Sequence, residues 1–364
     1  MEKVMNRRLA KKVGAAGSLL MGGLALAGCS VAPPEAVSRI LDMGWPDPVT
    51  PEGTQMYNFW VWVWAAAWII GIIMWSLFLV AVFKWNGTSR SKKTDDEFPK
   101  QLQYNVPLEL ALTIVPIIIV FSLFFFTVQT QTVVTARDKD PEVTVDVTAF
   151  QWNWKFGYAE VGPSLSPTGA LYEGVDEDRQ ARADETKYDS EDTPNPNPIH
   201  GNSMGDLSYL NYDLIETTGS TEEVPVLVLP TGTPIEFRLA SADVNHAFWV
   251  PEFLFKRDAY AHPEANQQER SFQIEQIERE GAFVGRCAEM CGTYHSMMNF
   301  EVRAVSPEAF RDYIRFRTEN PGATNAEALR AIGQEPYATS THPFNSSRTD
   351  GRDGDNYNDP NADA

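Results

Sequence analysis

Two long apolar runs near the start of the chain limit its fold more than any other feature. The run Phe59–Phe83 holds 25 residues without a charge, and a second run over about 108–128 has Glu109 near its start and few other polar residues. A helix of about 20 apolar residues crosses the hydrocarbon core of a bilayer, and buried helices of soluble proteins are seldom this long and this apolar. We therefore predict a transmembrane helical hairpin within 56–130.

The first residues predict export. Five basic side chains precede an apolar, small-residue stretch that ends Leu-Ala-Gly-Cys, so we interpret 1–28 as a signal peptide. This ending resembles the bacterial lipobox, which makes Cys29 the expected site of lipidation; an ordinary signal cleaved nearby is the alternative. Residues 29–55 would then form an extracytoplasmic N-terminal segment.

The positions of the Lys and Arg residues predict the membrane topology. Five Lys and Arg residues lie between the two spans, which places that loop in the cytoplasm of a bacterial cell and everything after about residue 130 outside. The net charge is −19, and the part from Gln129 onward holds 40 acidic and 19 basic residues. This balance excludes nucleic acid as a partner and suits a basic protein.

The chain from about 140 to 305 has the pattern of an all-β domain. Segments such as Val143–Ala149, Ile235–Leu239 and Phe300–Val305 alternate in polarity between Gly and Pro turns, which predicts a sandwich or barrel of antiparallel strands. A segment at 160–216 with 13 acidic and 3 basic residues reads as a long surface insertion, ordered in part at best. A helix is expected over 306–334, and 335–364 as a polar, disordered tail.

A cluster of soft donors carries the chemistry. Cys287, Cys291, His295 and Met298 fall within 12 residues, and thiolate, thioether and imidazole together suit copper. A disulfide between the two cysteines is the simpler alternative for an exported chain. A second imidazole is needed, and His246, after a predicted strand, is the best placed. His262 is the second choice, whereas His200 and His342 lie in the insertion and the tail.

These residues belong to a larger pattern. C-x-E-x-C-G-x-x-H-x-x-M, preceded by D-V-x-H and Q-W-x-W, resembles subunit II of cytochrome c oxidase, of the aa3-type heme-copper family. The resemblance implies a cupredoxin-like Greek-key domain that holds the dinuclear copper A centre. It implies that Cys287 and Cys291 bridge two copper ions and that His246 and His295 each bind one ion. The thioether of Met298 and the backbone carbonyl of Glu289 would be weaker donors.

The resemblance also implies roles for other residues. Trp152 would receive electrons at the surface, whereas Trp154 is expected to pack in the interior. The Glu289 carboxylate would reach a Mg²⁺ or Mn²⁺ ion shared with subunit I, and Glu109 would lie at the mouth of a proton channel. Asp243 would help to dock the donor.

The implied activity is that of cytochrome-c oxidase, with this chain as the electron-accepting subunit. Its partners would be subunits I and III, with the hemes on the partner subunit, and cytochrome c or a cytochrome c domain of a bc complex. The acidic insertion would suit a fixed contact with such a complex. A tethered copper-delivery protein, which would have a thioredoxin-like fold, and a quinol oxidase subunit II, which lacks the copper ligands, are the alternatives.

Overall fold

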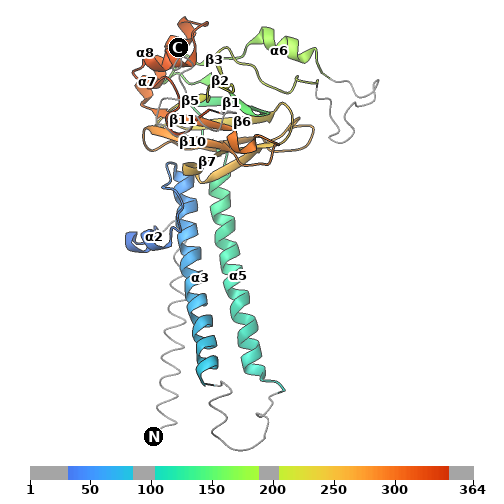
Figure 1. The fold of residues 1–364 in the computed structure, drawn as a ribbon, viewed down its shortest axis with the longest axis vertical. Coiled ribbons are helices and arrows are strands. Elements are labelled where there is room, and N and C mark those ends of the chain that lie inside the picture. The colour runs from blue at the N-terminus through green and yellow to red at the C-terminus, as the bar shows by residue number, and fades with distance from the viewer. Residues whose placement is uncertain (1–31, 85–102, 188–204, 344–364) are drawn as a thin grey trace, which may run out of the picture. The chain divides into compact units, whose positions relative to one another are not determined.

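The computed structural model describes residues 32–84, 103–187 and 205–343 (Figure 1). The chain divides into two compact units, one that contains Gln55–Val134 and one that contains Pro46–Thr54 together with the residues from Thr135 onward. The predicted signal peptide 1–28, Cys29 and most of the loop between the spans lie outside the described residues.

The first unit is helical. Its elements are α2 (Glu35–Leu41), most of α3 (Pro51–Lys84) and α5 (Val106–Val134). The helices α3 and α5 contain the predicted spans and are long and apolar enough to cross a membrane. Their large apolar side chains are exposed in the chain alone, as at Trp75 and Phe83, which is the surface expected of helices solvated by lipid.

The second unit is a β-sandwich. Its strands are β1 (Val143–Phe150), β2 (Asn153–Val161), β3 (Tyr172–Glu173), β4 (Glu216–Thr218), β5 (Val226–Pro230), β6 (Ile235–Ser241), β7 (His246–Val250), β8 (Phe255–Ala259), β9 (Ser271–Ile274), β10 (Gly281–Cys287) and β11 (Asn299–Val305). One sheet has the order β3-β2-β1-β6-β9, with β4 also paired to β2, and the other has the order β5-β11-β10-β7-β8. The predicted cupredoxin-like class is confirmed.

The strand pairing differs from the expectation in one respect. We predicted antiparallel strands, but β1 pairs with β6 in parallel, and β11 pairs with β5 in parallel. The alternation of polar and apolar residues along a strand indicates which face of the strand is buried. It does not indicate whether the neighbouring strand runs parallel or antiparallel. The parallel pairs therefore could not be read from the polarity pattern.

Aromatic side chains fill the space between the sheets. Phe237 of one sheet and Phe248 of the other lie 5.4 Å apart between ring centroids, and Phe248 stacks on Phe300 at 4.7 Å. Trp154, fully buried as predicted, packs edge-on against Phe300. This rigid layer ends beside His246, whose ring lies 6.3 Å from that of Trp154.

The described parts of 160–216 pack against the sandwich. Beyond β3 and β4, which extend the sheet at β2, this segment contains α6 (Glu177–Asp184). Glu216 forms ion pairs with Lys155 of β2 and with Arg179 of α6, each at 2.7 Å. Charge pairing and strand pairing thus hold a segment that has few aliphatic residues.

The C-terminal part differs from the predicted single helix over 306–334. Two helices, α7 (Pro307–Glu319) and α8 (Asn325–Ala331), are separated at Pro321-Gly322. The chain then stays on the domain past 335, because the buried carboxylate of Glu301 accepts hydrogen bonds from the N–H groups of Thr339 and Ser340, each at 2.7 Å. The predicted tail therefore begins too early; residues 344–364 lie outside the described residues.

Candidate metal centre

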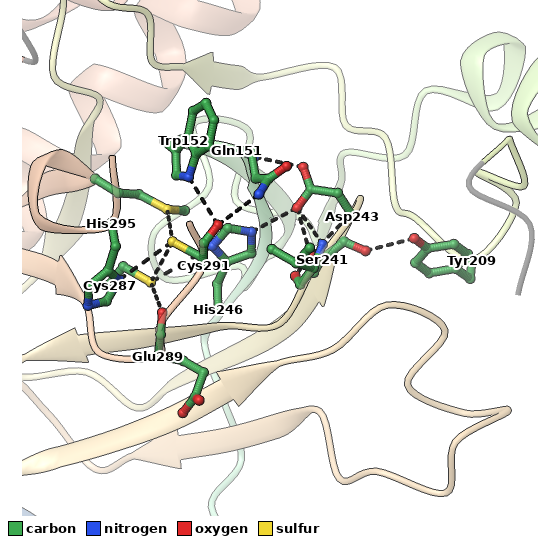
Figure 2. Close-up of polar contacts among 12 residues, drawn as sticks. Gln151, Trp152, Tyr209, Ser241, Asp243, His246, Cys287, Glu289, Cys291 and His295 are labelled. Carbon is green, nitrogen blue, oxygen red and sulfur yellow. Dashed lines mark hydrogen bonds and ion pairs between the residues drawn. The ribbon is translucent and has the colours of Figure 1, made fainter. Parts of the chain in front are cut away.

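Three connections of the sandwich meet at one end. The turn between β1 and β2 carries Trp152, and the loop from β6 to β7 carries Asp243 and leads to His246. Strand β10 ends at Cys287, and the loop from β10 to β11 carries the other candidate ligands. The last of these loops includes the short 3-10 helix η2 (His295–Met297). Residues far apart in sequence are thereby brought to one place (Figure 2).

The two cysteines face each other as free thiols. Their Sγ atoms are 3.8 Å apart, and both side chains are buried. A disulfide has an S–S distance of about 2.05 Å, so the disulfide that we considered from the sequence is absent. Thiolate–metal bonds of about 2.3 Å would allow one ion to contact both sulfurs at this separation.

One imidazole lies beside each thiol. Nδ1 of His246 is 3.8 Å from Sγ of Cys287, and Nδ1 of His295 is 3.5 Å from Sγ of Cys291. The ligand atoms of His246 and the two cysteines all lie within 4.8 Å of one another. His246 is fully buried and His295 is half-buried, so the two imidazoles differ in their access to solvent.

Two weaker donors complete the set. Sδ of Met298, a buried side chain, is 3.9 Å from Sγ of Cys291, and the carbonyl oxygen of Glu289 is 3.2 Å from Sγ of Cys287. The Glu289 side chain points away from the thiols (Figure 2). Its carbonyl and its carboxylate can therefore serve different ions.

The donor set fits copper. Two thiols, two imidazoles, a thioether and a carbonyl converge without a disulfide, and this combination of soft sulfur and imidazole donors is the one that copper prefers. Magnesium and calcium prefer all-oxygen ligands. The structure thus brings together every residue that the sequence assigned to the copper site.

Trp152 lies at the outer side of this centre. Trp152 belongs to the turn before β2, whereas Trp154 lies within that strand, so the two side chains need not point the same way. Its indole Nε1–H donates to the carbonyl of Cys291 at 3.0 Å, and its ring meets Tyr294 edge-on. Trp152 is half-buried, so its indole joins the surface of the domain to the backbone of Cys291, a candidate ligand.

Gln151 is a residue that sequence reasoning missed. Its side-chain amide donates to the same Cys291 carbonyl at 2.7 Å, and its backbone N–H donates to Asp243 at 2.7 Å. The signal was present in the Q-W-x-W pattern, in which only the tryptophans were given roles.

Asp243 holds His246 in a defined orientation. Its Oδ1 is 2.8 Å from Nε2 of His246 and accepts the N–H of Val244 at 2.7 Å. Because Nε2 faces a carboxylate, the Nε2–H tautomer is favoured, which leaves the Nδ1 lone pair for a metal. Asp243, which we expected to dock the donor, is thus occupied by contacts within the domain.

The protonation of these groups follows from their contacts. Burial favours neutral His246, but the contacts with Asp243 and Cys287 together outweigh burial and raise the pKa of His246. Burial likewise disfavours a thiolate at Cys287, yet the contact with His246 and hydrogen bonds with the backbone of Ala247 and Glu289 together lower the pKa of Cys287 to about 7. Burial and the neighbouring Cys287 raise the pKa of Cys291 to about 12. A metal that binds both thiolates would therefore release protons.

The other candidates lie elsewhere. His262, the second-choice ligand, packs at a tilt against Tyr209, with ring centroids 3.9 Å apart, and is not among the residues grouped with the thiols. Glu109 lies in the first turn of α5, where its carboxylate accepts the backbone N–H of Asn105 at 2.8 Å. His342 is not among the residues that meet the thiols, and His200 lies outside the described residues.

Several known proteins are similar to this chain. A family model described as cytochrome C oxidase subunit II, periplasmic domain, matches residues 206–305. Proteins named cytochrome c oxidase subunit 2 from Corynebacterium diphtheriae and Corynebacterium glutamicum are 63% and 65% identical over 99% and 98% of this chain, which covers 99% of each. The crystal structure of the periplasmic domain of subunit II of cytochrome oxidase of Bradyrhizobium japonicum is 20% identical, with a TM-score of 0.29, over 50% of this chain and 97% of that one.

The similarity to the Corynebacterium proteins extends over nearly the whole chain, from the helical unit through the candidate metal centre. Identity at this level and over this length is decisive for membership of a family. The chain therefore belongs to the cytochrome c oxidase subunit II family and is a subunit of a heme-copper oxidase.

Proposed function

We propose that this chain accepts electrons from cytochrome c at a dinuclear copper A centre and passes them to heme in subunit I, where oxygen is reduced to water and protons are pumped. One observation carries the proposal: two free thiols 3.8 Å apart have an imidazole nitrogen beside each sulfur. Cys287, Cys291, His246, His295, Met298 and the Glu289 carbonyl would hold the copper ions.

The protein's contribution is a fixed ligand set. A bridged copper pair would supply a one-electron carrier that changes little in geometry on reduction. The chain holds the ligands in place through the Asp243–His246 contact and the buried β-sandwich, and the N–H of Cys287 donates to the carbonyl of Met298 at 3.1 Å. A ligand set held in this way resists rearrangement between redox states.

Electrons would reach the centre through Trp152. The route is short, because the half-buried indole is hydrogen-bonded to the carbonyl of Cys291, a candidate copper ligand. Tyr294 and Met290 are exposed close by in sequence to the ligands, which gives this end of the domain an apolar surface within an acidic protein. A basic donor would be steered by the charge and would contact the apolar surface.

The partners and remaining sites follow the same assignment. Subunits I and III would surround α3 and α5, which would cross the membrane with the copper domain outside the cell and with Cys29 as a lipid anchor. The Glu289 carboxylate would bind Mg²⁺ or Mn²⁺ together with subunit I, and Glu109 would take up protons. Asp243 and the acidic segment 160–216 would contribute to the docking of cytochrome c or of a cytochrome c domain of a bc complex.

The alternatives have less support. A thioredoxin-like copper-delivery protein would have an α/β fold, whereas His246 and both cysteines here lie on a β-sandwich. A quinol oxidase subunit II would lack the copper ligands, and this chain has all of them.

The test uses the assembled oxidase with wild-type or Cys287→Ala subunit II. We expect reduced cytochrome c to drive oxygen consumption by the wild type only, while a small reductant that reaches subunit I directly still reduces the heme of the variant. Equal cytochrome c oxidation by the two complexes would overturn the proposal, as would oxidation of quinol by the wild type without cytochrome c.

A further inference from the structure

The acidic segment 160–216 makes a direct contact with the loop that carries His246. We call residues 241–246 the ligand loop. Tyr209, near the end of the acidic segment, donates its hydroxyl to the carbonyl of Ser241 at 2.7 Å (Figure 2). The Tyr209 ring also packs against the ring of His262 at a tilt of 36°, with the centroids 3.9 Å apart. One side chain of the segment therefore contacts the domain through both its hydroxyl and its ring.

Ser241 makes the hydrogen bonds that order the start of the ligand loop. It is fully buried, and its backbone N–H donates to the carbonyl of Tyr260 at 2.9 Å. Its hydroxyl accepts the N–H of Asp243 at 3.1 Å and donates to the carbonyl of Val244. A shift of Ser241 would thus move Asp243.

The carboxylate of Asp243 lies 2.8 Å from Nε2 of His246, so a shift of Asp243 would also move the imidazole. The connection from Tyr209 to the imidazole therefore runs through Ser241 and Asp243, with each link at hydrogen-bond distance. Groups that orient a histidine ligand change metal affinity about 10- to 100-fold when they are removed. A residue one link further out should act in the same way and more weakly.

We propose that Tyr209 is a positioning residue for the metal ligand His246, so that the acidic segment helps to set the geometry of the copper centre. The inference rests on the proposed copper function. Burial, with Asp206 and Asp243 nearby, raises the pKa of Tyr209 well above its usual value. The hydroxyl accordingly remains a donor over the whole range in which the oxidase could work.

Tyr212 provides a matched control on the same segment. Its ring packs against Lys155 and Arg179, and among the described residues its hydroxyl makes no hydrogen bond. Tyr212→Phe therefore removes the same atom as Tyr209→Phe without touching the ligand loop.

The experiment compares the full-length wild type, Tyr209→Phe and Tyr212→Phe, each loaded with copper. EPR measures the copper hyperfine splitting, and a chelator measures the rate of copper loss. We expect Tyr209→Phe to alter the splitting and to lose copper about threefold to tenfold faster, while Tyr212→Phe matches the wild type. This effect is smaller than that of removing a group that contacts the histidine ligand itself. A role in folding alone would leave the spectrum of the loaded centre unchanged.

A second variant keeps the test decisive if Tyr209→Phe does not fold. His262→Ala retains the hydroxyl and removes the ring that fixes it, so we expect a change in the splitting in the same direction. Wild-type spectra and rates in the variants that fold would overturn the inference. A wild-type chain that binds no copper pair would instead refute the proposed function, so the two failures are distinguishable.

Discussion

The indole nitrogen of Trp152 donates to the backbone carbonyl of Cys291 at 3.0 Å, and the side-chain amide of Gln151 donates to the same oxygen at 2.7 Å. Two consecutive residues of one turn thus hold the peptide group of a candidate bridging cysteine. This relationship links the surface aromatic ring to the centre and determines how closely the loop approaches the turn.

Loss of the indole N–H should slow electron arrival. Trp152→Phe keeps an aromatic ring and removes the donor to Cys291. We expect the oxidase to retain its copper and to accept electrons from reduced cytochrome c about tenfold more slowly, which corresponds to about 1.4 kcal/mol on the barrier. Stopped-flow reduction of the centre measures the rate. An unchanged rate with full copper content would exclude Trp152 from the route.

Gly292 is required by the close approach of the loop to Trp152. Its φ is +120°, and a Cβ there would lie 3.2 Å from the Gln151 amide nitrogen and from the indole of Trp152. Gly292→Ala should destabilise the domain by about 1–3 kcal/mol, measured by the unfolding midpoint of the full-length chain. Gly322→Ala is the control, because that position has open space and no positive φ. Equal midpoints for the two variants would contradict this account.

Loss of the Asp243 carboxylate should weaken copper binding more than it weakens the docking of the electron donor. Asp243→Asn weakens the acceptor for His246, so we expect copper loss to a chelator to become about 10- to 100-fold faster. The exposed Glu222 provides the control variant Glu222→Gln, for which copper loss should be unchanged. If Asp243→Asn keeps its copper and reduces only the salt dependence of electron transfer, Asp243 is a docking residue and not a positioning residue.

Asp213 should make the copper domain less stable at high pH. Among the described residues, neither carboxylate oxygen of this buried side chain has a hydrogen-bond partner. Burial, with Asp146 and Glu216 nearby, raises its pKa from 3.8 to about 8. The folded state therefore holds a proton that the unfolded state releases above pH 3.8. Stability should be fully present below that pH and fall by up to about 1.4 kcal/mol per pH unit as pH rises towards 8.

Asp213→Asn removes this proton. We expect the variant to have a higher unfolding midpoint than the wild type at pH 8, with a smaller difference at pH 5, while Asp178→Asn on the exposed face of α6 should follow the wild type at both. A parallel pH dependence in wild type and Asp213→Asn would show that Asp213 is ionised in the folded domain.

The sequence predicted the parts of this protein whose signals are local. Uncharged runs gave α3 and α5, alternation gave most of the sandwich, and the spacing of Cys287, Cys291, His295 and Met298 gave one side of the centre. These signals suffice because each depends on neighbours within one turn, strand or loop.

Several features that depend on contacts between distant segments were not predicted. The parallel pairing of β1 with β6, the hydrogen bond from Tyr209 to Ser241, and the attachment of residues 339 and 340 to Glu301 all join segments more than 30 residues apart. Glu301 illustrates the reason. The alternating pattern predicts only that this residue lies in a strand. Its carboxylate becomes a buried hydrogen-bond acceptor because the C-terminal segment lies over it.

The copper content and EPR spectrum of the purified full-length chain test the central claim most directly. The account predicts two copper ions per chain and a signal from one electron shared between them, both lost in Cys287→Ala. One copper ion with a blue mononuclear signal, or no bound copper, would contradict it.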